Sequence, residues 1–224
     1  MRRLSTSLLL AALSAAAVVV ATGGPGEAAS RNAGTSAALD DMGQDISTAT
    51  TEVNRFWARH WGDFFDGRYS RPKIVGGYSR SGKLPPYCGN KRVSYNNAFY
   101  CPSGDYITWD IDLLKSGYRS GDAWVYLVIA HEWGHAVQAR IDPSLRWRGR
   151  ELQADCLAGA ALFGAAEDGA LEFEEGDVDE LVAAFDRLGD RTPWTKESDH
   201  GTPAQRLSAF NRGADGGVDG CLPD

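Results

Sequence analysis

The sequence lacks a long hydrophobic run, an excess of positive charge and any closely spaced pair of cysteines. Its N-terminal apolar stretch, residues 8–21, is shorter than the roughly 20 residues of a membrane-spanning helix. The net charge of −7 argues against nucleic acid or an anionic membrane surface as a partner. Because no Cys-x-x-Cys pattern is present, a zinc site built from cysteines is disfavoured. We therefore expect no nucleic acid and no stable membrane partner.

The first residues instead have the pattern of a secretory signal peptide. Arg2 and Arg3 precede the apolar stretch, residues 23–26 are glycine and proline, and small residues follow up to Ser30. We expect residues 1–29 to be removed on export, which makes the protein secreted. The alternative is an uncleaved signal anchor that tethers it to a membrane. Residues 30–45 show no periodicity and are predicted to be a flexible linker, so the folded domain is expected over residues 46–224.

All four cysteines lie in this exported part: Cys88, Cys101, Cys156 and Cys221. An even number of cysteines in an exported chain predicts two disulfides, for which three pairings exist. We favour the pairing of Cys88 with Cys101, which closes a short loop, and of Cys156 with Cys221, which ties a helix to the C-terminus.

Hydrophobic periodicity predicts an α+β fold. Aromatic residues recur at helical spacing from about residue 46 to 65, and His60 on this helix is expected to be structural. Residues 98–101 and 106–110 are predicted to be strands joined by a turn that contains proline and glycine. These two strands would form a small β-sheet on which a central helix can pack. A short helical turn is expected after them, at residues 110–115.

The central helix is predicted over residues 122–140, with Asp122 as its N-cap. It is apolar almost all round, as a helix buried in the centre of a domain is. The C-terminal part is expected to be mostly helical, with helices at residues 149–167, at residues 177–188 and from Thr202, where Pro203 occupies the first helical position.

The central helix carries the segment His131-Glu132-Trp133-Gly134-His135, an HExxH pattern. Residues four apart share one face of a helix, so His131 and His135 can bind one zinc ion. Glu132 projects beside the ion and can act as general base on a zinc-activated water.

A catalytic zinc usually has a third protein ligand. A third histidine six residues after the second would occupy position 141, which is isoleucine. The alternative is Glu151 near the start of the next helix, where Asp155 shares its face. Asp155 can accept the free N–H of one histidine ligand and fix its tautomer.

These residues resemble the bacterial neutral zinc metallopeptidase family over about residues 87–221. The resemblance rests on several segments: Cys88, residues 97–102 (NAFYCP), the strand up to Asp110, Gly121-Asp122, residues 131–138 (HEWGHAVQ), residues 151–159 (ELQADCLAG), His200-Gly201-Thr202 and Gln205-Arg206. It implies a zincin-like fold with a glutamate ligand and a site similar in logic to that of thermolysin. Trp133 and Ala136 depart from the expected pattern without changing the ligands.

The role of His200 has two possible interpretations. In zincins of this kind a downstream histidine often stabilises the tetrahedral intermediate, and such a preformed donor is worth about 3 kcal/mol. In the other reading, His200 is a loop residue at the start of the helix that begins at Thr202.

The sequence thus predicts a secreted zinc metalloendopeptidase that cleaves a polypeptide substrate. We expect the substrate to pair with residues 106–110 as an edge strand. The alternatives are a non-catalytic interaction module stabilised by zinc and a zinc amidase that acts on cell-wall peptides.

Overall fold

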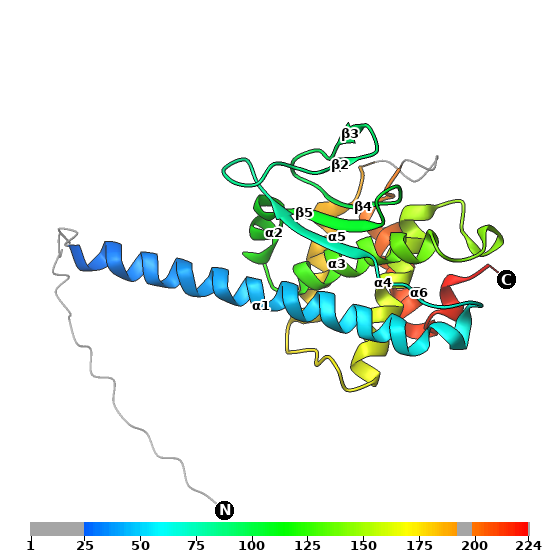
Figure 1. Ribbon diagram of the computed structural model, residues 1–224. Helices are drawn as coiled ribbons and strands as arrows, with labels where there is room; N and C mark the ends of the chain where they lie inside the picture. The colour runs from blue at the N-terminus through cyan, green and yellow to red at the C-terminus, as the bar shows by residue number, and fades with distance from the viewer. Residues whose placement is uncertain (1–24, 192–198, 224) are drawn as a thin grey trace, which may run out of the picture. The chain divides into compact units, whose positions relative to one another are not determined.

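The computed structural model describes residues 25–191 and 199–223, whose helices and strands are drawn in Figure 1. The chain divides into two compact units, residues 1–37 and 38–224. Helix α1 (Pro25–Phe64) begins in the first unit and continues in the second. The predicted signal peptide lies mostly outside the described residues. No helix in the described part of the chain is long and apolar enough to cross a membrane.

Residues 30–45 are helical, whereas the sequence analysis expects a linker there. The expectation of a linker follows from the absence of hydrophobic periodicity. Intrinsic propensity does not explain the helix, because the segment holds three alanines beside many serine, glycine and aspartate residues. Met42 within it is 5% exposed and belongs to the core of the second unit, so packing contributes to the helix at this end of the segment. The domain boundaries themselves stay a prediction.

The second unit has an α+β architecture. Its strands are β1 (Lys73–Tyr78), β2 (Tyr87–Cys88), β3 (Lys91–Arg92), β4 (Ala98–Cys101) and β5 (Tyr106–Asp110). Its further helices are α2 (Ile111–Tyr118), α3 (Ala123–Gln138), α4 (Arg150–Glu167), α5 (Asp177–Leu188) and α6 (Pro203–Gly216), with the short 3₁₀ helices η1 (Pro143–Leu145) and η2 (Asp219–Cys221). The predicted strands at 98–101 and 106–110 are confirmed, as is the buried central helix.

The main sheet has the strand order β1-β5-β4, with β1 parallel and β4 antiparallel to β5. The prediction that residues 106–110 form an edge strand is therefore wrong. Strand β5 is central, and all five of its residues are buried. Glycine and proline are frequent in residues 67–90, which predicts short strands and turns there but gives no partner for them. The pairing of β1 with β5 therefore could not be predicted from local sequence. Strand β4 is the edge that lies near α3.

Helix α1 belongs to the core of the second unit from Met42 onward. Val53 and Trp57 have no exposed surface, and Trp61 is 4% exposed. His60 on the same helix is structural, as expected, because its ring nitrogens bond Asp63 at 3.0 Å and Asp168 at 2.9 Å.

Two glycines allow α4 and α6 to pack closely. A Cβ atom on Gly159 would lie 2.2 Å from the carbonyl oxygen of Phe210, and one on Gly213 would lie 1.9 Å from that of Cys156. Helix α6 starts as predicted, with Thr202 and Gln205 in a capping box and Pro203 in the first turn. The glycine contact packs the later turns of α6 on the middle of α4, and Arg206 in the first turn of α6 reaches Asp155 on α4.

The predicted N-cap of α3 is only partly right. Asp122 occupies the N-cap position but makes no capping hydrogen bond with its side chain. Glu180 on α5 provides the capping hydrogen bond instead, because its Oε2 accepts from the Ala123 backbone N–H at 3.2 Å.

The favoured cysteine pairs are both present as disulfides, Cys88–Cys101 and Cys156–Cys221. Disulfides form and persist in oxidising compartments, so they indicate an extracytoplasmic location. They close loops of different size, with sequence separations of 13 and 65 residues respectively.

Removing one disulfide or the other should therefore lower the free energy of unfolding by different amounts. Replacing Cys156 and Cys221 by alanine is expected to lower the free energy of unfolding by about 4 kcal/mol, and replacing Cys88 and Cys101 by about 3 kcal/mol. Urea unfolding of the two double variants beside the oxidised wild type measures both values. The reverse order of stability would contradict an origin in loop closure.

His60 should make stability depend on pH. Burial lowers its pKa, but the carboxylates of Asp168 and Asp63 outweigh burial and raise the pKa above its ordinary value. The stabilisation is then complete below the unfolded pKa of about 6.5 and is lost as the pH rises through the folded pKa. We expect the melting temperature of the wild type to exceed that of His60→Gln by more at pH 6 than at pH 9. An equal difference at both pH values would disprove the ion pairs.

Candidate active site

The structure brings together the three predicted metal donors. The Nε2 atoms of His131 and His135, on α3, lie 3.3 and 3.4 Å from the two carboxylate oxygens of Glu151, on α4. The three ligand atoms all lie within 4.8 Å of one another. This separation suits atoms that share a single ion.

Gly134 allows the backbones of α3 and α4 to approach each other closely. A Cβ atom at this position would lie 2.7 Å from the carbonyl oxygen of Ala154 and 2.9 Å from its Cα atom. Since these contacts are to backbone, a larger residue could be accommodated only by moving one helix. Glu151 lies one turn before Ala154, so the same contact sets its distance from the histidines.

Both imidazoles are held at their other nitrogen. Nδ1 of His131 lies 2.7 Å from Oδ1 of Asp155, as the sequence predicts, and Nδ1 of His135 lies 3.0 Å from Oε1 of Gln138. The amide of Gln138 is oriented in turn by the Arg150 carbonyl oxygen, which accepts from its Nε2 at 2.6 Å. With a proton on each Nδ1, the Nε2 lone pairs are directed at the cluster, as metal coordination requires.

Arg206 on α6 completes the support of His131. Its Nε and Nη2 atoms donate to the two oxygens of Asp155, both at 2.8 Å, and the pair is almost completely buried. Burial opposes ionisation of Asp155, but Arg206 and His131 outweigh burial and hold its pKa below the ordinary value. Asp155 therefore remains an anion that can accept the N–H of His131.

The sequence analysis assigned no role to Gln138 or Arg206. Gln138 could have been found, because it follows His135 by three residues and so lies on the same helix face. Arg206 comes from a distant helix, so no local spacing indicates its partner.

The charges of the donor cluster depend on one another. Burial opposes the charged form of His131, but Asp155 and Glu151 outweigh burial and raise its pKa to about 10. Burial likewise opposes ionisation of Glu151, but its hydrogen bonds to His131 and His135 lower its pKa well below the usual range. Without a metal ion, a proton on His131 balances the carboxylates, and a cation that binds must displace it.

The donor set fits zinc. Two imidazole nitrogens and one carboxylate oxygen are a known ligand set of catalytic zinc sites, which leave one position open. The preset Nδ1 protons and the anionic Glu151 both agree with this assignment.

Glu132 lies beside the donors and is not one of them. Its side chain reaches strand β4, where the Tyr100 backbone N–H donates to its Oε2 at 2.7 Å. The residue is only 7% exposed, and burial raises its pKa above the ordinary value. A buried carboxylate with a raised pKa is suited to accept and release a proton.

A cleft of about 800 Å³ opens over the cluster and contains Glu132, the three donors and His200 in its walls. One end is apolar, because Trp124, Leu127 and Val128 line it from the first turns of α3. No described residue of α1 lines this cleft.

His200 lies in the wall of the cleft but outside the donor cluster. Its side chain is 54% exposed, with Nδ1 3.6 Å from Oδ1 of Asp190. Its backbone N–H donates to Oδ2 of the same carboxylate at 2.8 Å. Asp190 thus anchors His200 at the cleft, whereas Thr202 itself caps α6.

Adding a methyl group at Gly134 should separate the donors. We expect Gly134→Ala to weaken zinc binding and to lower the free energy of unfolding by about 1–3 kcal/mol, because the methyl group overpacks the helix contact. Calorimetric zinc titration and urea unfolding measure the two effects.

Gly62→Ala is the matched control, since a Cβ atom there would meet nothing within 4 Å on the exposed face of α1. It should leave zinc binding unchanged. Wild-type zinc affinity in Gly134→Ala would show that the helix contact does not set the donor spacing.

Comparison with known proteins agrees with this site. A family model described as "Putative neutral zinc metallopeptidase" matches residues 10–221. Two relatives, each named uncharacterized protein YpfJ, come from Escherichia coli strain K12 and from strain O6:H1 CFT073. Both are 33% identical over 205 residues, which cover 77% of this chain and 67% of theirs. No solved structure matches. The family model spans most of the sequence and includes every donor described above, and the chain therefore belongs to this family of neutral zinc metallopeptidases.

Proposed function

We propose that the protein is an exported zinc metallopeptidase that hydrolyses internal peptide bonds of a polypeptide. The observation that carries the proposal is the convergence of His131, His135 and Glu151 on one point beside the buried carboxylate of Glu132. A purely structural zinc site closes its fourth position and needs no adjacent base. The two disulfides support export, for which residues 1–29 would serve as the signal peptide.

The catalytic roles follow from the contacts. Zinc, held by His131, His135 and Glu151, would supply a Lewis acid and acidify water from a pKa of about 15.7 to about 7. Oε2 of Glu132 already accepts the Tyr100 N–H, so Oε1 is the atom that takes a proton from the attacking water. The same atom then delivers this proton to the nitrogen of the leaving amine.

Asp155 and Gln138 keep the imidazoles in the ligating tautomer during these steps. His200 projects from the wall of the cleft, and we assign it to the developing oxyanion as a hydrogen-bond donor.

Strand β4 is the element on which a substrate can lie. Asn97 accepts a backbone hydrogen bond from Asp110, so the antiparallel alternation directs the backbone groups of Ala98 and Tyr100 away from β5. The Tyr100 N–H is used by Glu132, which leaves Ala98 to pair with the main chain of a substrate. This assignment replaces the expectation that residues 106–110 bind it. The apolar end of the cleft would accept an apolar side chain.

Replacing the base tests the function. We expect Glu132→Gln to lower kcat about 10²- to 10⁴-fold, because the amide cannot take up the proton. The variant should retain zinc, since Glu132 is not a donor. Measurements are the metal content of purified protein and chelator-sensitive cleavage of denatured casein.

Glu52→Gln removes another buried carboxylate, one that lies on α1 and outside the cleft, and should leave kcat unchanged. Undiminished casein cleavage by Glu132→Gln would refute the mechanism. Zinc binding without turnover in the wild type would favour the non-catalytic module. Cleavage of peptidoglycan peptides but not of casein would favour the cell-wall amidase.

A further inference from the structure

The hydrogen bond that holds Glu132 comes from the backbone of another element. Among the described residues, the Tyr100 N–H is the donor recorded for its carboxylate. Glu132 is carried by α3 and Tyr100 by β4. The orientation of the carboxylate therefore depends on how β4 is placed against α3.

Strand β4 is paired on one side only, with β5. An edge strand is less constrained than a central one, so its position depends on further contacts. At the start of the strand, the Tyr78 hydroxyl donates to the carbonyl oxygens of Ser94 and Asn97. The hydrogen bonds that link β4 to α3 and to the residue after its C-cap lie at the other end, at Tyr100.

Arg140, directly after the C-cap of α3, makes the polar contacts at this end. Its Nη2 lies 2.6 Å from Oδ1 of Asp105 in the β4–β5 turn, and its Nη1 lies 3.3 Å from the Tyr100 hydroxyl oxygen. The Tyr100 hydroxyl donates to the same Asp105 oxygen at 3.0 Å. The guanidinium also donates to the Ala136 carbonyl oxygen at 2.7 Å, so it joins α3 to β4 at Tyr100. Its Nε donates to the carbonyl oxygen and the hydroxyl of Ser70, at 2.7 and 3.1 Å, in the segment before β1.

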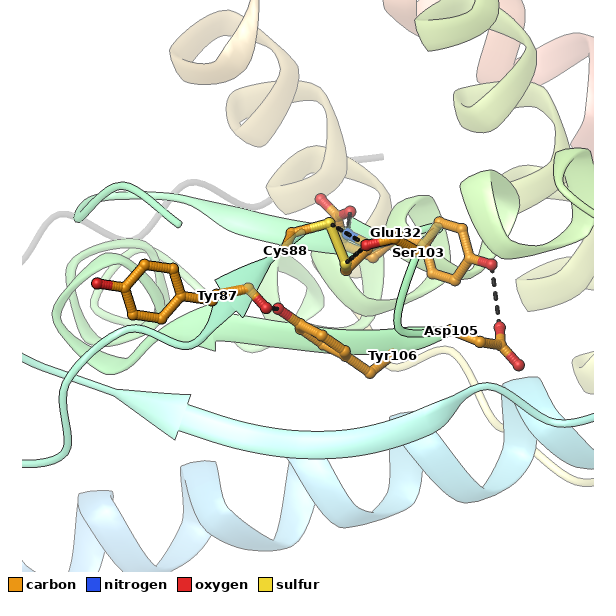
Figure 2. Close-up of a disulfide and its surroundings, with 8 residues drawn as sticks. Tyr87, Cys88, Ser103, Asp105, Tyr106 and Glu132 are labelled. Atoms are coloured by element: carbon orange, nitrogen blue, oxygen red, sulfur yellow. Dashed lines mark hydrogen bonds between the residues drawn. A yellow bond between two sulfur atoms is a disulfide. The ribbon is translucent and has the colours of Figure 1, made fainter. Parts of the chain in front are cut away.

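A disulfide fastens the next residue of β4. Cys101 is bonded to Cys88 of β2, and the Ser103 hydroxyl lies within 3.4 Å of both sulfur atoms. Figure 2 shows the disulfide of Cys88 with Ser103 next to it, and a dashed line that marks the hydrogen bond to Asp105. Because this bond is covalent, β4 should stay attached to the domain when the polar contacts are removed.

We propose that Arg140 is a positioning residue that sets the register between the general base and strand β4 through Tyr100 and Asp105. The catalytic part of this inference rests on the proposed peptidase function. Tyr100 is held at both ends, its phenol by Arg140 and Asp105 and its N–H by Glu132. A side chain anchored in this way prevents the strand from turning about its axis, and such a turn would move the N–H.

A displacement of β4 should change kcat and KM to different extents. A substrate paired with Ala98 would move with β4, whereas Glu132 and the metal donors remain on α3 and α4. A shift of β4 should therefore misalign the scissile bond and the base and leave substrate pairing intact. Misplacement of reacting groups by about 1 Å costs up to about 100-fold in rate.

The test uses the zinc-loaded full domain with Arg140→Gln, Arg140→Lys and Tyr100→Phe. We expect Arg140→Gln to lower kcat for a fluorogenic peptide about 10- to 100-fold, with KM changed less than about threefold and zinc content unchanged. Tyr100→Phe, which removes the hydroxyl alone, should show a smaller loss. Arg140→Lys should restore part of kcat, because lysine retains the charge but not the forked donors. Arg59→Gln, which removes an exposed arginine paired with Asp168, is the control and should retain full kcat.

Amide hydrogen exchange provides a readout independent of turnover. We expect the Tyr100 amide of Arg140→Gln to exchange faster than in the wild type. The Leu157 amide, within the buried part of α4, should exchange at the wild-type rate, because the hydrogen bonds of Arg140 in the described part of the chain do not reach α4. Faster exchange at both amides would indicate general destabilisation and overturn the proposal.

The outcomes distinguish this inference from the proposed function. A wild type without turnover refutes the peptidase, and exchange of the Tyr100 amide then decides alone whether Arg140 positions β4. Unchanged Tyr100 exchange in Arg140→Gln overturns the inference whether or not the wild type cleaves peptides. Faster Tyr100 exchange with undiminished kcat overturns its catalytic part.

Discussion

The close contact between α3 and α4 is the constraint on which the candidate site depends. One helix can present two imidazoles four residues apart, but the third donor must come from a neighbouring element at a set depth. Gly134 allows the backbone of Ala154 to approach α3, and Glu151 lies one turn earlier on α4. The glycine within the HExxH segment thus serves the site through packing, although it offers no ligand atom.

Charge balance explains why α6 belongs to the site. Asp155 has no exposed surface, and a buried carboxylate without a partner is strongly destabilising. Arg206 supplies two hydrogen bonds and the opposite charge, and the small residues Gly159 and Gly213 let α6 come close enough to deliver them. Asp155 can therefore hold His131 as a stable anion. A zinc ion bound by His131, His135 and Glu151 would take the place of a proton on His131, so zinc binding would depend on pH.

The parts of the molecule that the sequence predicts are those determined by local spacing. His131 with His135, and Glu151 with Asp155, lie four residues apart on helices, so helical periodicity alone places each pair on one face. The β4–β5 hairpin follows in the same way from two short apolar segments around a turn.

Features that depend on distant contacts were missed or predicted wrongly. The position of β5 in the centre of the sheet depends on β1, which arises from a glycine-rich segment without a clear strand pattern. Arg206 becomes part of the site only because α6 packs on α4, and no local pattern announces that contact. The helical state of residues 30–45 has no local signal either, because the segment holds three alanines among many weak helix formers, and Met42 within it packs on the core through tertiary contacts.

The site combines two separate supports. The metal donors and Glu132 are carried by α3 and α4, whereas β4 is the strand available to a substrate. Tyr100 joins them, because its backbone N–H bonds the base and its side chain contacts the end of α3 through Arg140. In the proposed mechanism, these two supports must keep a common register so that Glu132 can reach a peptide bond of a substrate paired with β4. Among the described residues, polar contacts and a disulfide hold the Tyr100–Cys101 end of β4, and further hydrogen bonds hold residues 94–97 at its start. Alignment at the site therefore depends on contacts that lie outside the α3–α4 core.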